Sequence, residues 1–172
     1  MPYPEALVQP MRAELTRLGV DELTDANAVD QVMDDADGKT MLVVVNSVCG
    51  CAAANARPAV ALAKQNEVQP NRYVTVFAGQ DLEATARMRE HLQGIPPSSP
   101  FMALLKDGDP VFVLERRHIE GRSASAIATD LVGAFDTYCG TDAAADGEAE
   151  RPSVDAQPDA RGELPDTFRS IL

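Results

Sequence analysis

Residues 41–52, MLVVVNSVCGCA, join a continuous apolar run to two cysteines separated by one glycine. The run from Met41 to Val45 is rich in valine and has no polar interruption, which predicts a strand buried on both faces of a sheet. The alanine-rich pattern that follows, from Ala52 onward, predicts a helix. Cys49 and Cys51 are therefore expected at a strand-to-helix junction.

Two thiols at the start of a helix are suited to redox chemistry. The first backbone N–H groups of a helix lack partners within it and that end is partly positive, so a thiolate placed there is stabilised and its pKa falls. We therefore predict that Cys49 is the nucleophile. Cys51 is close enough to attack a mixed disulfide on Cys49 and release the bound thiol, as the resolving residue.

Two other interpretations of the pair stay open at this point. Free cysteine is often a small buried hydrophobic residue, and a Cys-x-Cys pair can supply half of a zinc site. The chain offers only three further cysteine or histidine side chains, Cys139, His91 and His118, and no second closely spaced pair. The number and spacing of the cysteines and histidines thus favour redox chemistry and predict no metal site.

Length and charge limit the class of protein. The 172 residues are enough for one domain with a hydrophobic core, and leave some residues beyond what that domain needs. A net charge of −12 argues against nucleic acid or an anionic membrane surface as partner, and the apolar runs are too short to span a membrane. With three cysteines and no signal-like segment in residues 1–5, we expect a cytoplasmic protein, its oligomeric state left open.

The hydrophobic pattern predicts alternating helices and strands. Expected strands cover residues 40–46, 73–77, 101–106 and 111–115, the last two joined by a tight turn. Expected helices cover residues 5–18, 24–38, 52–65 with a kink at Pro58, and 81–93, followed by a last helix capped by Ser123 or Ser125.

The composition changes near residue 140. Residues 140–172 contain eight acidic residues and three arginines, and large apolar residues are scarce until the end. Such a segment cannot bury enough surface to offset its ordering entropy, so we predict a domain over residues 1–139 and a disordered acidic tail over residues 140–172. Apolar residues within 164–172 give the tail an end that can dock on the domain or on a partner.

The predicted order of elements resembles the thioredoxin fold. This resemblance implies an α/β three-layer sandwich, with a central mixed four-stranded sheet, helices on both faces, and here extra N-terminal helices. It also implies a cis-proline directly before the hairpin and facing the cysteines, and Pro100 directly precedes Phe101. Ser99 and Pro100 are therefore the candidate platform for an extended thiol substrate. An ordinary trans proline starting the strand is the alternative, with Pro96 and Pro97 nearby.

More specific motifs resemble the bacilliredoxin family of bacterial thioredoxin-like proteins. The most diagnostic stretch is NSVCGCAAANARP, residues 46–58. Further matching segments are VFAGQD at 76–81, PSSP at 97–100, ALLK at 103–106, HIEG at 118–121 and the end of the last helix at 134–139. The resemblance covers residues 3–139 and leaves the tail outside.

This resemblance implies a thiol–disulfide oxidoreductase that reduces mixed disulfides between bacillithiol and cytosolic proteins. Bacillithiol, a low-molecular-weight thiol, is then a co-substrate, and no cofactor is bound. Disulfide isomerase activity is the family's other implied role, and a redox-sensing binding protein is an alternative of another class. Ser47 and Gly50 are candidate substrate-binding residues, and Arg57 either holds a substrate carboxylate or forms a surface ion pair.

Two residues outside the motif have predicted roles. His118 either shuttles a proton or binds an anionic thiol, or it is a loop histidine with local hydrogen bonds. Cys139 ends the last helix, far in sequence from the cysteine pair, and is expected to take no part in the reaction.

The strand before the cysteines differs from that of ordinary thioredoxins. Those proteins carry a buried acidic residue there, whereas residues 41–45 contain none.

Overall fold

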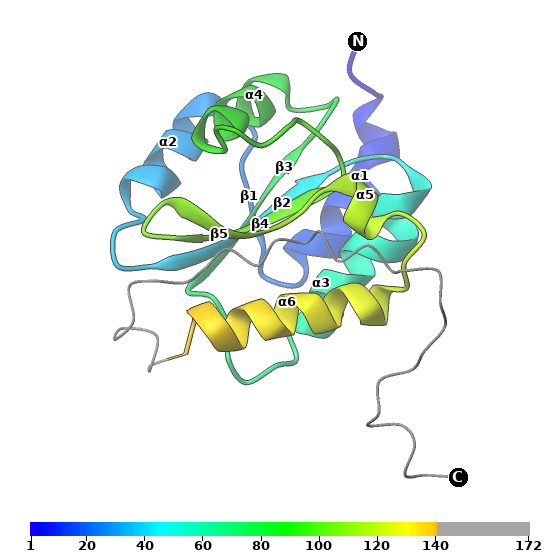
Figure 1. Ribbon diagram of the computed structural model, residues 1–172. Helices are drawn as coiled ribbons and strands as arrows, with labels where there is room; N and C mark the ends of the chain where they lie inside the picture. The colour runs from blue at the N-terminus through cyan, green and yellow to red at the C-terminus, as the bar shows by residue number, and fades with distance from the viewer. Residues whose placement is uncertain (141–172) are drawn as a thin grey trace, which may run out of the picture.

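The computed structural model describes residues 1–140, so the predicted tail lies outside the described residues apart from Gly140. Its strands are β1 (Asp21–Glu22), β2 (Thr40–Asn46), β3 (Arg72–Phe77), β4 (Phe101–Lys106) and β5 (Asp109–Leu114). Its helices are α1 (Glu5–Thr16), α2 (Ala26–Asp34), the π-helical segment η1 (Ala52–Ala56), α3 (Arg57–Ala63), α4 (Leu82–His91), α5 (Arg116–Ile119) and α6 (Ala124–Tyr138). Figure 1 shows their arrangement.

The strands form one mixed sheet in the order β1-β3-β2-β4-β5. β3 pairs in parallel with β1 and β2, whereas β4 is antiparallel to β2 and β5 is antiparallel to β4. All seven residues of the central strand β2 are buried, as its continuous apolar run predicts. The sheet has five strands instead of the predicted four, because the short β1 adds Asp21 and Glu22 at one edge. The sequence does not predict this strand, because two successive polar residues lack the alternation of apolar and polar side chains that is typical of a strand.

Helices cover both faces of the sheet, which confirms the thioredoxin-like three-layer α/β architecture. α2 and α4 lie on one face, and α3 and α6 lie on the other (Figure 1). Side chains along β2 alternate between the two layers: Leu42 and Val44 pack with α3 and α6, while Val43 and Val45 belong to the opposite core. Within residues 1–140, no helix is long and apolar enough to cross a membrane.

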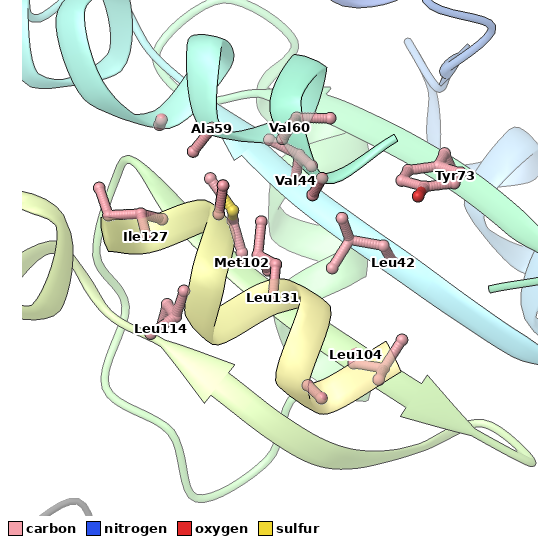
Figure 2. Packing of buried hydrophobic residues seen from close by; sticks show 14 of the residues in the cluster. Leu42, Val44, Ala59, Val60, Tyr73, Met102, Leu104, Leu114, Ile127 and Leu131 are labelled. Carbon is pink, nitrogen blue, oxygen red and sulfur yellow. The ribbon is translucent and has the colours of Figure 1, made fainter. Parts of the chain in front are cut away.

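The core beneath α3 and α6 anchors the end of β2. Figure 2 shows the fully buried side chains that meet there: Leu42, Val44, Ala59, Val60, Met102, Leu104, Ile127 and Leu131. Each large aliphatic side chain buried in this way contributes about 1.5–3 kcal/mol relative to an exposed one. The strand and helix on either side of the cysteines are therefore both fixed by the same core.

The helix after the cysteines is irregular near Pro58, as predicted, but the irregularity precedes the proline. Arg57 donates its backbone N–H to the carbonyl of Ala52, five residues back, which makes η1 a π-helix. Pro58 then lies in the first turn of α3. Because proline has no N–H and its ring crowds the carbonyl four residues earlier, a widened turn at Ala52–Ala56 accommodates it.

Two local features differ from expectation. The short helix α5 is absent from the predicted elements, because its four residues carry no helical periodicity. β5 begins two residues earlier than predicted, at Asp109, because the hairpin turn comprises only Asp107 and Gly108, both with positive φ. A bulge at Leu104 and Leu105 then accommodates Pro110 on this edge strand.

Candidate active site

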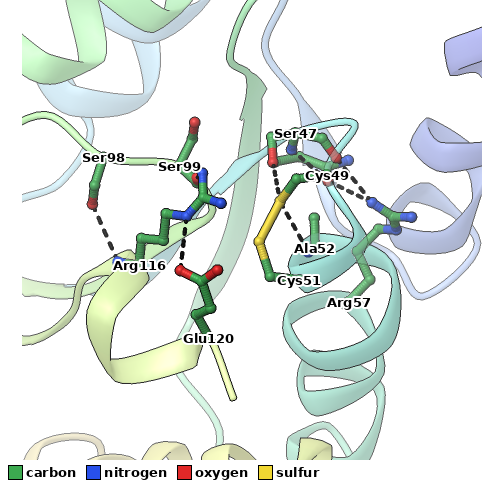
Figure 3. Close-up of a disulfide and its surroundings, with 10 residues drawn as sticks. Ser47, Cys49, Cys51, Ala52, Arg57, Ser98, Ser99, Arg116 and Glu120 are labelled. Atoms are coloured by element: carbon green, nitrogen blue, oxygen red, sulfur yellow. Dashed lines mark hydrogen bonds and ion pairs between the residues drawn. A yellow bond between two sulfur atoms is a disulfide. The ribbon is translucent and has the colours of Figure 1, made fainter. Parts of the chain in front are cut away.

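The two cysteines lie where the sequence predicts them, at the junction between β2 and the helical segment that leads into α3 (Figure 3). They form a disulfide with a Cα–Cα distance of 5.4 Å. Both cysteines are half-buried and Gly50 between them is exposed, so the pair does not consist of buried core residues. Among residues 1–140, no group of three or more His, Cys, Asp or Glu side chains is arranged to hold a metal ion.

The sulfur of Cys49 has two polar neighbours. The hydroxyl of Ser47 lies 3.2 Å from it, and the backbone N–H of Ala52, in the first turn of the helical segment, points to it at 3.4 Å. Backbone N–H groups at a helix start and hydroxyl donors both stabilise negative charge. The geometry therefore favours a thiolate on Cys49 once the disulfide is reduced.

Arg57 holds the loop that precedes Cys49. Its guanidinium donates to Asn46 Oδ1 and to the carbonyl oxygen of Ser47, each at 3.1 Å. Asn46 Oδ1 in turn accepts the backbone N–H of Ser47 at 2.9 Å. Arg57 Nε donates to Glu14 Oε2 on α1 at 2.7 Å. The arginine thus links α1, α3 and the end of β2.

The position of Arg57 requires a correction to its predicted role. The side chain is only 3% exposed, and its donors are engaged by protein oxygens. It forms neither a surface ion pair nor a contact surface for a substrate carboxylate. The sequence could not indicate this, because the partners Glu14 and Asn46 come from two other elements.

A cavity of about 350 Å³ opens beside Cys49. It is lined by residues of the N-terminal segment, the ends of β2 and β3, α4, the loop before β4 and α5: Tyr3, Ser47, Val48, Cys49, Ala78, Gly79, Arg89, Ser99 and Arg116. Of the predicted site residues, it brings together Cys49, Ser47 and Ser99. The other predicted residues, Cys51, Gly50, Pro100 and Arg57, are not part of this lining.

The Ser99–Pro100 peptide bond is cis, as predicted. Ser99 shares the cavity with Cys49, which agrees with a platform facing the redox pair. Arg116 holds this loop from the other side: its backbone N–H donates to Ser98 Oγ at 3.3 Å and its Nη1 to the carbonyl of Ser99 at 3.4 Å. Figure 3 shows Arg116 and its partner Glu120 across from the disulfide.

Six lining residues were not among the candidates, and three of them carry a polar side-chain group: Tyr3, Arg89 and Arg116. Tyr3 is held near the cavity because its backbone N–H donates to Gln80 Oε1 at 2.8 Å. Arg89 lies in the last turn of α4, where an arginine most often faces solvent. Arg116 belongs to the pair of arginines that precedes His118. This basic pair is the sequence feature that could have pointed to Arg116.

His118 and Cys139 lie outside the cavity. His118 Nδ1 accepts the backbone N–H of Glu115 at 3.0 Å, which confirms the predicted local hydrogen bond, but the residue lies in the short helix α5 and not in a loop. Burial, and then the charge of Arg117, lower its pKa from the ordinary value. Cys139 lies near Thr40, at the opposite end of β2 from Cys49, and burial raises the pKa of its thiol. A strand of this length separates the two cysteines by about 20 Å.

Comparisons with known proteins identify the family of the chain. Residues 3–139 match the family model described as disulphide isomerase. Two bacilliredoxins of Salinibacter ruber are 60% and 54% identical, each over 99% of both chains. A bacilliredoxin of Bacillus licheniformis is 52% identical over 80% of this chain and 95% of its own. Among solved structures, a Fasciola hepatica thioredoxin is 20% identical over 68% of this chain and 97% of its own, with a TM-score of 0.48. The chain belongs to the bacilliredoxin family and is a thiol–disulfide oxidoreductase.

Proposed function

We propose that the protein reduces mixed disulfides between bacillithiol and cytosolic proteins, acting in the cytoplasm with Cys49 as the nucleophile. The observation that carries this proposal is that Cys49, but not Cys51, lines the cavity. Its sulfur is also the one that contacts Ser47 and the N–H of Ala52. The names of the relatives support the substrate class.

The first step is an exchange of disulfides. The Cys49 thiolate attacks the bacillithiol sulfur of the mixed disulfide, the sulfur–sulfur bond to the target protein breaks, and the target leaves as a thiolate that takes a proton from water. Bacillithiol is now bonded to Cys49, and no net oxidation or reduction has occurred. The exposed position of Gly50 leaves room for an incoming protein beside the nucleophile.

The second step removes bacillithiol from Cys49 by one of two thiolates. Cys51 attacks the Cys49 sulfur, which releases bacillithiol and forms the Cys49–Cys51 disulfide seen here. In the alternative route, the thiolate of a second bacillithiol attacks the sulfur of the bacillithiol that is bonded to Cys49, which yields bacillithiol disulfide and a free Cys49 thiolate. In the first route an external reductant must restore the two thiols.

Disulfide isomerase activity is a second candidate, and the oxidised pair favours it. The Cys49–Cys51 disulfide is partly accessible, so a substrate thiolate can attack it and accept the disulfide. The description of the matching family supports this alternative.

A turnover assay tests the proposal. The reduced protein is mixed with a many-fold excess of a bacillithiolated protein and of free bacillithiol, and release of the target thiol is followed. We expect many turnovers per chain, and none with Cys49→Ser. Repair of a scrambled disulfide protein, without turnover of the bacillithiolated substrate, would instead establish the isomerase.

A further inference from the structure

The cavity beside Cys49 contains two arginines that the mechanism above does not use. Arg89 is half-buried in the last turn of α4, and within residues 1–140 its guanidinium has no hydrogen-bond or ion-pair partner. On its other side it borders a small apolar recess with Leu92, Ile95 and Phe101. Ser98 is the one polar residue besides Arg89 in the lining of this recess, so the recess offers few acceptors and the cavity is the side on which a ligand can meet the guanidinium.

Arg116 faces the same cavity from α5. Its side chain is 46% exposed, with Nε 3.2 Å from Glu120 Oε2 and Nη1 donating to the Ser99 carbonyl at 3.4 Å. A guanidinium has five N–H donors, so these two contacts leave donors for a ligand. The contact with Ser99 also fixes the guanidinium beside the loop opposite Cys49.

The lining carries positive charge in a strongly acidic protein. The chain has 27 acidic and 15 basic residues, yet none of the described lining residues is Asp or Glu, whereas two are arginines. A concave site with charge of one sign attracts ligands of the opposite sign. Planar guanidinium groups are also the donors that match carboxylate oxygens in pairs.

We propose that Arg89 and Arg116 bind the carboxylates of a low-molecular-weight thiol and thereby place its sulfur against Cys49. This assignment rests on the proposed function, because it describes how the bacillithiol half of the mixed disulfide is recognised. The carboxylate contact that the sequence suggested for Arg57 is thus assigned to residues from other segments.

The test uses one carrier protein with a single cysteine, loaded either with bacillithiol or with cysteamine, which has an amine and no carboxylate. For Arg89→Gln and for Arg116→Gln we expect kcat/KM with the bacillithiol substrate to fall about tenfold, the loss of a charge-assisted hydrogen bond. With Arg89→Gln the cysteamine substrate should be unaffected or react faster. With Arg116→Gln it should lose less than the bacillithiol substrate, since this change also removes the contact with the Ser99 carbonyl. An equal loss with both substrates, or no loss with bacillithiol, would overturn the assignment.

Matched controls come from the neighbouring arginines. Arg87 is on the same helix as Arg89, but its guanidinium pairs with Asp30 and it does not line the cavity. Arg117 follows Arg116 and pairs with Glu115. Arg87→Gln and Arg117→Gln should leave both rates near those of the wild type. A loss specific to bacillithiol in either control would show that general surface charge is responsible.

A second readout separates this proposal from the proposed function. Reduced wild type and variants are reacted with dithiobis(nitrobenzoate), a disulfide bearing carboxylates, and with dithiodipyridine, which bears none. We expect Arg89→Gln and Arg116→Gln to slow only the first reaction, several-fold. If the wild type fails to turn over the bacillithiol substrate but this selectivity is present, the proposed function fails while the carboxylate site stands. Equal rates for wild type and variants with both reagents would overturn the site itself.

Discussion

The hydroxyl of Ser47 lies 3.2 Å from the sulfur of Cys49, and the carbonyl of the same serine accepts a hydrogen bond from the buried Arg57. Ser47 thus contacts both the sulfur of the nucleophile and a buried arginine. Its hydroxyl supports negative charge on sulfur, while its backbone is fixed by α3.

Replacing Ser47 with alanine should slow the reaction of Cys49. Loss of one hydrogen bond to the thiolate lowers its population near neutral pH, and we expect the rate with dithiodipyridine to fall about fivefold at pH 7. At strongly alkaline pH, where the thiol is ionised in both proteins, the rates should converge. A rate at pH 7 equal to that of the wild type would show that the hydroxyl does not support the thiolate.

Replacing Arg57 with methionine should destabilise the fold and slow Cys49. The change removes the donor to the Ser47 carbonyl oxygen and one of the two donors to Asn46 Oδ1, and we expect the free energy of unfolding in urea to fall by about 2 kcal/mol. Arg57→Lys should lose less, since it keeps the charge.

The control for Arg57 is Arg72→Met. Arg72 pairs with Asp21 at the surface, where an ion pair contributes about 0.5 kcal/mol. Equal losses for Arg57→Met and Arg72→Met would contradict a specific role for the buried guanidinium.

His118 should make stability depend on pH. Burial lowers its pKa in the folded protein from the ordinary value of 6.5. Below that value the unfolded chain therefore binds more protons, and stability decreases as the pH falls from 6.5 through the lower pKa of the folded state. Urea unfolding at several pH values should show a smaller decrease for His118→Gln, whose amide can still cap the N–H of Glu115. Identical pH profiles would exclude His118 as the source.

Cys139 should be dispensable. It lies near Thr40, at the end of β2 remote from Cys49, so it is too distant to resolve a mixed disulfide there. We expect Cys139→Ala to retain near wild-type turnover of a bacillithiolated protein at saturating reductant. A loss as large as that of Cys49→Ser would make Cys139 a third redox residue.

The features that were predicted correctly have local causes. The bounds of β2 follow from seven successive buried residues, and those of β4 from a similar run between Pro100 and the turn at Asp107. The cysteine pair lies at the predicted junction because the apolar run and the alanine-rich pattern meet there.

The features that were missed depend on contacts between distant segments. β1 exists only because its two polar residues pair with Val74 and Thr75. Arg57 is buried because Glu14 and Asn46 converge on it, and nothing near it in the sequence shows this. Arg89 and Arg116 meet at one cavity although 27 positions separate them, and each alone has the pattern of a solvated helix residue.

The position of bacillithiol on the protein shows whether Cys49 is the nucleophile. Reduced wild type, Cys49→Ser and Cys51→Ser are each reacted with a bacillithiolated protein in the absence of free bacillithiol, and peptides carrying residues 49 and 51 are identified by fragmentation mass spectrometry. We expect Cys51→Ser to accumulate bacillithiol on Cys49 and Cys49→Ser to accumulate none. Bacillithiol on Cys51, with Cys49 unmodified in the wild type, would contradict the assignment of Cys49 as the nucleophile.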